Sequence, residues 1–443
     1  MAGSLPISHD LADLWRVSQP VLDLLGDGAF ADRRRAAWDA FQAVGLPTSR
    51  DEEFKFLNLH PLTEATFAPA YGANVDRSEI VRLPLGQLDA ITVTLVNGQI
   101  APELGTIDAL PEGVFIGPYD QLDERAQAEV LDQVGSISRL AGKLGSTNDE
   151  RFDHLNLAFL SELIVVRIPA NVTLQRPIHV QSLSFGNGPA ALIATRLWVE
   201  LGENAEATLV ESYSGLGGPM VTIPAAEYRL GRDARLNHVR YQDEHADAVQ
   251  FSVNALHQES GSVVTTTNVN FGGRLVRHDI NVWLNGEHTE TWLNGVNVAT
   301  SEQTMDNHTR IDHAKPNCNS FEVYKSILRD RAHGVFNGKI FVYEDAQKTD
   351  AKQTNQALLL SGTAQMNTKP QLEIFADDVK CTHGATIGQL QADAMFYLRA
   401  RGVPKAEAEA LLVFAFANDV IAKISVEAVR DALETRLFQK LNP

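Results

Sequence analysis

The stretch Ile193-Ala194-Thr195-Arg196-Leu197-Trp198-Val199-Glu200-Leu201 decides the fold of this chain. Apolar or β-branched side chains occupy every second position from Ile193 to Leu201, and Arg196, Trp198 and Glu200 fall between them. Successive side chains of a strand point to opposite faces, so the alternation predicts a β-strand. Similar runs recur from about residue 161 to about residue 390, almost without a helical period.

Weak internal repeats accompany these strands. The segment Leu201-Gly202-Glu203-Asn204-Ala205 matches Leu230-Gly231-Arg232-Asp233-Ala234, at an offset of 29 residues. The segments 293–295 and 336–338 are 43 apart, which we interpret as two turns of a little over twenty residues each. Fixed spacing in an all-strand region is typical of a β-solenoid, in which each turn pairs only with its neighbours. A β-sandwich is the alternative.

The flanking regions favour helices. We predict a mainly helical region over residues 1–160 with a short β segment at 91–98, a solenoid over 161–390, and a helical region over 391–443. The stretch 410–417 is apolar all the way round, whereas a surface helix needs only one apolar stripe. Either the C-terminal helices bury each other or part of their surface docks a partner.

Composition narrows the class of protein. The chain has 443 residues, 44% of them hydrophobic and 21% charged, which is ordinary for a folded domain. Its net charge of −18 disfavours a nucleic-acid partner. The start, Met1 to Pro6, lacks the features of a secretion signal, and no apolar run approaches the ~20 residues of a membrane helix. Two cysteines cannot form a disulfide framework, so we predict a cytoplasmic protein.

Familiar catalytic signatures are absent from the sequence. The run from Gly334 to Lys339 has three residues between its glycines and ends without a hydroxyl, so it is not a phosphate-binding loop. Asp377 and Asp378 point to opposite faces if they are extended, which makes a poor acid/base pair. We therefore predict a protein that is not an enzyme.

Polar residues within the strands have a structural interpretation. In stacked strands they form ladders that satisfy each other's hydrogen bonds. We assign this role to the histidines and asparagines of the region, and we expect Lys325 and Lys339 to face solvent. The residues concerned are His278, His288, His308, His313, Asn268, Asn270, Asn307 and Asn317.

The strongest candidate site is Asp378-Val379-Lys380-Cys381-Thr382-His383-Gly384-Ala385-Thr386. If this segment is extended, Cys381 and His383 point the same way, roughly 6–7 Å apart. A thiol and an imidazole suit iron, zinc or copper, but two ligands make only half a metal site. The pair also lies at the end of the predicted solenoid, where unpaired strand backbone invites another chain. The alternative is a cysteine that acts only as a small apolar side chain.

A family resemblance rests on these residues and on motifs upstream. The segments 380–390 and 396–402 resemble the SufB/SufD family of the Suf iron–sulfur cluster assembly machinery, and its SufD branch in particular. The segment Arg50-Asp51-Glu52-Glu53-Phe54-Lys55 also matches, with Phe54 and Phe56 where Trp and Tyr are commoner. Further matches lie at 306–309, 324–328, 335–339, 347–351, 356–361 and 370–374.

The resemblance implies a right-handed parallel β-helix between two helical regions. It also implies a non-catalytic scaffold that pairs with a SufB-type paralogue at the β-helix end and binds a SufC-type ATPase through its C-terminal helices. An iron–sulfur cluster would form transiently at that interface, close to His383 and Cys381. Such clusters are mostly held by four thiolates, which two cysteines cannot supply alone.

Three alternatives remain at this stage. A SufB-type paralogue usually has a Glu-containing sequence where this chain has Cys381-Thr382-His383, and it usually carries more cysteines. A β-helical carbohydrate-active enzyme needs paired carboxylates and commonly a secretion signal, and neither is visible. A purely structural subunit would make the Cys381–His383 pair incidental. In isolation the chain could also form a homodimer through the same end.

Overall fold

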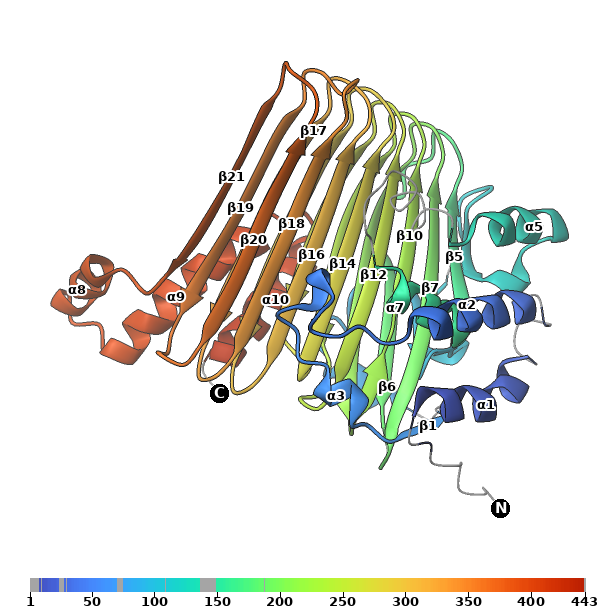
Figure 1. Cartoon of the computed structure of the whole chain (residues 1–443), viewed down its shortest axis with the longest axis horizontal. Coiled ribbons are helices and arrows are strands. Elements are labelled where there is room, and N and C mark those ends of the chain that lie inside the picture. The colour runs from blue at the N-terminus through green and yellow to red at the C-terminus, as the bar shows by residue number, and fades with distance from the viewer. Residues whose placement is uncertain are drawn as a thin grey trace.

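The computed structural model describes residue 8, residues 10–23, residue 28, and residues 30–69, 75–107, 109–135, 149–186 and 188–441. The segment 1–6, on which the absence of a secretion signal was predicted, lies outside these residues. The chain is a β-solenoid of about eight turns with helices at both termini (Figure 1). Two facing sheets of parallel strands form its walls.

Each turn of the solenoid gives one long strand to each sheet. The first sheet, which we call sheet A, contains β5 (Leu160–Ile168), β7 (Ala190–Leu201), β10 (Ala225–Leu230), β12 (Val249–Gln258), β14 (Leu275–Leu284), β16 (Thr304–His313), β18 (His333–Val342) and β20 (Gln365–Ile374), with β9 (Met220–Thr222) beside β7 and β12. The second, sheet B, contains β6 (Ile178–Phe185), β8 (Glu206–Gly217), β11 (Arg235–Asp243), β13 (Val263–Asn270), β15 (Glu290–Ala299), β17 (Asn319–Leu328), β19 (Asp350–Leu359) and β21 (Lys380–Gly388).

The repeat of 29 residues is confirmed. Leu201 of β7 pairs with Leu230 of β10 in the next turn, and the turn residues Asn204 and Asp233 both have positive φ. Asn and Asp tolerate this left-handed conformation better than most residues, so they suit the corners of these two turns. The interpretation of the 43-residue offset is wrong, because Leu293 lies in β15 of sheet B and Phe336 in β18 of sheet A.

Both faces of the alternating strand are buried, but in different cores. Leu197, Val199 and Leu201 point into the solenoid, where they join a core of apolar residues from both sheets. Trp198 points outward and is covered by the N-terminal helices, whose Trp15 and Trp38 belong to the same cluster. The outer face is therefore buried because a helical layer covers the sheet.

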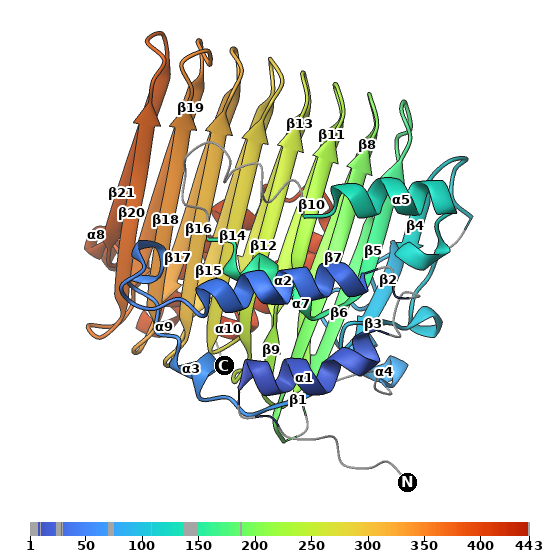
Figure 2. The ribbon, with the colours of Figure 1, turned by 45° about the vertical axis from the view of Figure 1, so that its right-hand side comes forward.

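The N-terminal region covers the outer face of sheet A at one end of the solenoid (Figure 2). Its strands extend both sheets there: β2 pairs with β6, and β4 pairs with β5. The predicted β segment at 91–98 contains β2, and helices such as α5 and α7 agree with the prediction of a mainly helical region. The elements are α1 (Leu11–Leu22), α2 (Ala31–Val44), η2 (Glu52–Phe54), α3 (His60–Thr63), β1 (Phe67–Pro69), α4 (Arg77–Val81), β2 (Ile91–Val96), β3 (Gln99–Ile100), η3 (Pro102–Leu104), β4 (Phe115–Pro118), η4 (Tyr119–Gln121), α5 (Glu124–Gln133) and α7 (Arg151–Ala158).

The C-terminal helices are α8 (Ala392–Ala400), α9 (Lys405–Ile421) and α10 (Glu427–Leu441). Apolar residues of α9 and α10 pack on the outer face of sheet B. Lys325 of β17 faces this layer, where its Nζ lies 2.8 Å from Asp419 Oδ2, so the expectation that Lys325 faces solvent is wrong. A long amphipathic side chain can bury its stem under a helix and still reach a carboxylate. No helix among the described residues is long and apolar enough to cross a membrane.

Candidate functional site

The far end of the solenoid is an open rim formed by β20 and β21. In the described part of the chain, β20 pairs only with β18 and β21 only with β19. Most side chains of these two strands are partly or fully exposed, unlike those of the preceding turns. Ile374, Phe375 and Ile387 stand 39%, 59% and 45% exposed here. The rim therefore offers unpaired strand backbone and apolar side chains together, which is what a further chain needs to add to a sheet.

Cys381 and His383 lie on β21, on the side that faces the solenoid interior. Cys381 pairs in register with Ala351 and packs against the interior apolar cluster of the last turns. His383 follows two positions later and is therefore on the same face. Cys381 is half-buried, and burial raises the pKa of its thiol. His383 is exposed at the rim.

The two side chains are not a complete metal site by themselves. Among the described residues, no group of three or more His, Cys, Asp or Glu could hold a metal ion. A metal bound at Cys381 and His383 thus needs donors from outside that part of the chain. Cys381 and His383 therefore share one face of β21, at a sheet edge that no described strand pairs with.

Beneath the rim lie polar residues that the sequence analysis missed. Gln353 of β19 pairs in register with His383, and Glu322 of β17 pairs with Gln353. Gln353 Nε2 donates a hydrogen bond of 2.7 Å to Glu322 Oε2. Burial raises the pKa of Glu322 to about 7 despite the hydrogen bond from Gln353. The sequence signal that could have revealed Gln353 and Glu322 is a polar residue at an inward position of an alternating strand.

The interior polar groups nearer the N-terminal end are better satisfied. Burial disfavours the charged form of Glu211, yet hydrogen bonding and attraction from His238 lower its pKa to about 2. His238 Nε2 lies 2.9 Å from Glu211 Oε1, and the hydroxyl of Tyr213 donates to Glu211 Oε2 at 2.5 Å. The hydroxyl of Tyr228 donates to the same carboxylate. The predicted ladders also occur here, since Asn270 Nδ2 donates to Asn297 Oδ1 at 2.9 Å.

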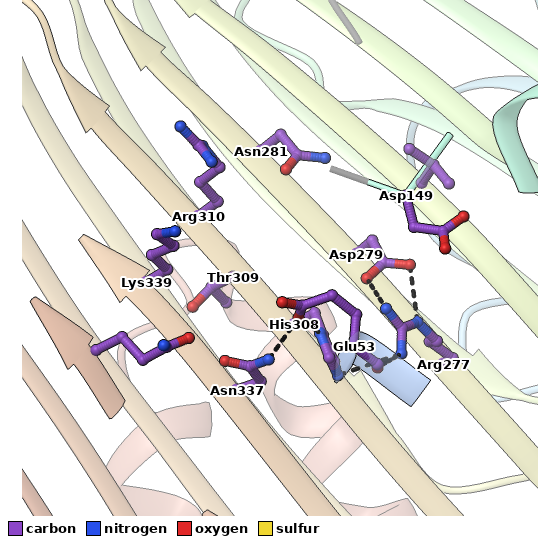
Figure 3. A pocket seen from close by; sticks show the side chains of 12 residues that line it. Glu53, Asp149, Arg277, Asp279, Asn281, His308, Thr309, Arg310, Asn337 and Lys339 are labelled. Carbon is purple, nitrogen blue, oxygen red and sulfur yellow. Dashed lines mark hydrogen bonds and ion pairs between the residues drawn. The ribbon is translucent and has the colours of Figure 1, made fainter. Parts of the chain in front are cut away.

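A second polar region lies on the outer face of sheet A, in a shallow cavity of about 60 Å³ (Figure 3). The segment η2 crosses three strands at this place. Glu53 Oε2 accepts a hydrogen bond of 2.6 Å from Asn337, and His308 Nδ1 lies 3.3 Å from the same oxygen. The guanidinium of Arg277 sits 3.9 Å from the centre of the Phe54 ring. The motif Arg50 to Lys55 therefore fastens the N-terminal region to the solenoid, and we call residues 52–54 the strap.

The charged groups at the strap hold each other in their ionised forms. Burial alone would lower the pKa of His308, but Asp306 and Glu53 raise it. Burial alone would raise the pKa of Glu53, but the hydrogen bond to His308 and nearby positive charges lower it. His308 Nε2 lies 3.0 Å from Asp306 Oδ1. This arrangement is a buried ion-pair network in which each charge has a partner, and His308 is not part of an interior ladder.

Comparison with known families assigns the chain. The model of the SufBD core domain of the SUF system for iron–sulfur cluster assembly matches residues 184–416, and the model of the SufBD N-terminal region matches residues 6–180. The chain belongs to the SufBD family. It thus has a role in iron–sulfur cluster assembly.

Three relatives match over nearly the whole chain. A SufBD family protein of Synechocystis sp. is 32% identical over 92% of this chain and 90% of its own length. The iron–sulfur cluster assembly protein SufD of Escherichia coli is 29% identical over 90% of both chains. The chloroplastic protein ABCI7 of Arabidopsis thaliana is 28% identical over 90% of this chain and 83% of its own length. The predicted resemblance to SufD is confirmed, and the chain stands with SufBD proteins rather than with carbohydrate-active enzymes.

Proposed function

We propose that the chain is a non-catalytic scaffold subunit of a Suf complex, on which an iron–sulfur cluster is assembled as cargo. The observation that carries the proposal is the open rim, where Cys381 and His383 face an edge that the described part of the chain leaves uncovered. A SufB-type paralogue adds its own strands to β20 and β21 and supplies the remaining donors. In isolation, a second copy of the chain can cover the same rim and form a homodimer.

The C-terminal helices are the proposed docking site for a SufC-type ATPase. Helix α8 has no buried residue, and its Phe396 and Tyr397 are 75% and 55% exposed. Helices α9 and α10 are tied to sheet B by Lys325–Asp419 at 2.8 Å and Arg436–Asp243 at 2.6 Å. Movement of a docked ATPase would therefore reach the solenoid, since these ion pairs connect the helices to its strands. On this proposal residues 1–160 cap the solenoid, 161–390 form it, and 391–443 meet the ATPase.

The test is a pull-down of the chain with its SufB- and SufC-type partners, followed by iron and sulfide analysis of the complex. We expect His383→Ala and Cys381→Ala to lower cluster loading without loss of complex formation. Thr382→Ala is the matched control, because Thr382 lies between the two on the opposite face of the same strand. Unchanged loading in the His383→Ala complex would count against the proposed role of the rim.

A further inference from the structure

Three inward-facing residues stand one above another in the last turns of sheet B. Glu322 of β17 pairs in register with Gln353 of β19, and Gln353 pairs with His383 of β21. Neighbouring strands lie about 4.8 Å apart, so Gln353 is the side chain directly beneath the proposed ligand. We call these three residues the rim column.

Only the nitrogen of the Gln353 amide makes a hydrogen bond. Its Nε2 donates to Glu322 Oε2 at 2.7 Å, whereas its Oε1 is buried and has no hydrogen-bond partner. A buried oxygen without a partner is destabilising, so its presence calls for an explanation. Glu322 fixes which end of the amide points where, because only the NH₂ group can donate to the carboxylate. The oxygen of Gln353 is thereby left as a ready acceptor next to His383.

A histidine that binds a metal uses one ring nitrogen and donates the other N–H to a neighbouring group, which fixes the ring. We propose that Gln353, held in place by Glu322, accepts this N–H when His383 binds iron and so orients the ligand for the partner subunit. This inference rests on the proposed function of His383. Gln353 and Glu322 are positioning residues, since neither of them touches the metal.

The Gln353 amide packs against Gly338 on the facing sheet. A Cβ added at Gly338 of β18 would lie 2.4 Å from Gln353 Nε2 and 2.8 Å from its Cδ. Both distances are shorter than real contacts, so an alanine at this position must displace the amide. Gly338→Ala therefore perturbs Gln353, and also Phe336, whose Cζ would lie 2.7 Å from the added Cβ, while His383 and Glu322 are not replaced.

The neighbouring column offers a matched control. Asn355 lies two positions after Gln353 on β19, and it too is buried with an oxygen that lacks a partner. It pairs in register with Ala385, which has no side-chain donor. Asn355 thus matches Gln353 in strand and side-chain chemistry, but no candidate metal ligand pairs with it.

The experiment titrates Fe²⁺ anaerobically into the purified complex of the full chain with its partners and records the thermal midpoint of each variant. We expect Gln353→Leu and Gly338→Ala to weaken iron binding about 10- to 100-fold. We expect Asn355→Leu to bind as wild type does. The midpoint of Gln353→Leu should fall somewhat, because Glu322 Oε2 loses the hydrogen bond that Gln353 donates. The double swap Glu322→Gln/Gln353→Glu should restore binding, because it places a carboxylate acceptor beneath His383.

The outcomes separate this inference from the proposed function. If His383→Ala loses iron while Gln353→Leu and Gly338→Ala bind it as wild type does, the inference is overturned and the proposed function stands. Iron binding lost as strongly in Asn355→Leu as in Gln353→Leu, or a double swap as defective as Gln353→Leu, also overturns it by indicating a merely structural role. If His383→Ala binds iron normally, the proposed function fails first.

Discussion

The two ends of the solenoid follow the same strand pattern but are finished differently. At the N-terminal end, β2 and β4 extend the sheets and a layer of helices covers the outer face of sheet A. At the other end, β20 and β21 stop without a cover among the described residues. The interior follows this difference: Glu211 near the closed end has His238 and tyrosine partners, whereas Glu322 near the rim keeps one oxygen without a partner. The chain itself covers the closed end, whereas the rim is the surface at which we propose that a second subunit binds.

The largest expected loss of stability follows from removing the buried charge network at the closed end. Arg196 donates to Glu227 and Asp153 beneath the N-terminal helices, at 2.6 and 2.8 Å. Arg196→Leu leaves two buried carboxylates without their cation, so we expect unfolding in urea to show a loss of about 3–5 kcal/mol. Arg229→Ala, at an exposed position of β10, is the control and should change stability by less than about 0.5 kcal/mol. A change below about 1 kcal/mol in Arg196→Leu would contradict the assignment.

Glu211 and Glu322 test the difference between the two ends further. A Glu→Gln substitution should change the free energy of unfolding in opposite directions at these two positions. The folded pKa of Glu322, about 7, lies above its ordinary value, so its contribution to stability is lost as pH rises from about 4.5 through 7. At pH 8, Glu322→Gln should therefore raise the free energy of unfolding, by up to about 3 kcal/mol, and near pH 4 the gain should vanish. Glu211→Gln should lower it at pH 8, because the lowered pKa of Glu211 reflects stabilisation that is present above about 4.5. Equal signs at pH 8, measured in urea, would show that the two ends do not differ in this way.

A charge on the rim tests whether the open end is an interface. Ile387 is 45% exposed there, and Val44 at the end of α2 is 55% exposed. We expect Ile387→Asp to weaken binding of the SufB-type partner about tenfold, or about 1.4 kcal/mol, while the fold stays intact. Val44→Asp should leave binding unchanged. Isothermal titration with both variants makes the comparison, and equal affinities would contradict the assignment of the rim.

The strap should give the smallest effect, as a pH dependence of stability of about 1.4 kcal/mol for each unit by which folding shifts a pKa. The raised pKa of His308 stabilises the fold below about pH 6.5, and this contribution is lost as pH rises through the folded value. The lowered pKa of Glu53 stabilises the fold above about pH 4.3, and this contribution is lost on acidification. Stability from the strap should peak between these limits, and His308→Gln should remove the alkaline slope. His288→Gln, in an exposed turn, should keep that slope in the same urea titration.

The strands could be predicted because alternation is a local signal, but the contacts between turns could not. The pattern from Ile193 to Leu201 reveals two faces without showing that one lines the interior and the other lies under helices. Lys325 was placed in solvent for the same reason, since a covering helix leaves no mark on the strand it covers. The rim column was missed because it depends on register across turns: Glu322 pairs with Gln353, 31 positions on, and Gln353 with His383, 30 positions on. Turn lengths that vary by single residues hide such columns from the sequence.

The arrangement of Cys381 and His383 was easier to foresee, because two residues spaced by two positions must share a face of any strand. Their position at the last turn followed from the return of helical patterns after residue 390. Further donors for the proposed site could not be predicted, because no group of three or more His, Cys, Asp or Glu that could hold a metal ion lies among the described residues.

The single-sided pairing of β20 and β21 also has a consequence for motion. Each strand of the preceding turns is hydrogen-bonded to a strand on either side, so opening it breaks two ladders, whereas each strand of the last turn can fray by breaking one. Its amide protons should exchange with solvent faster than those of the adjoining turns. A docked subunit would slow that exchange by giving the strands a second neighbour, so Cys381 and His383 would become more rigid once the rim is covered.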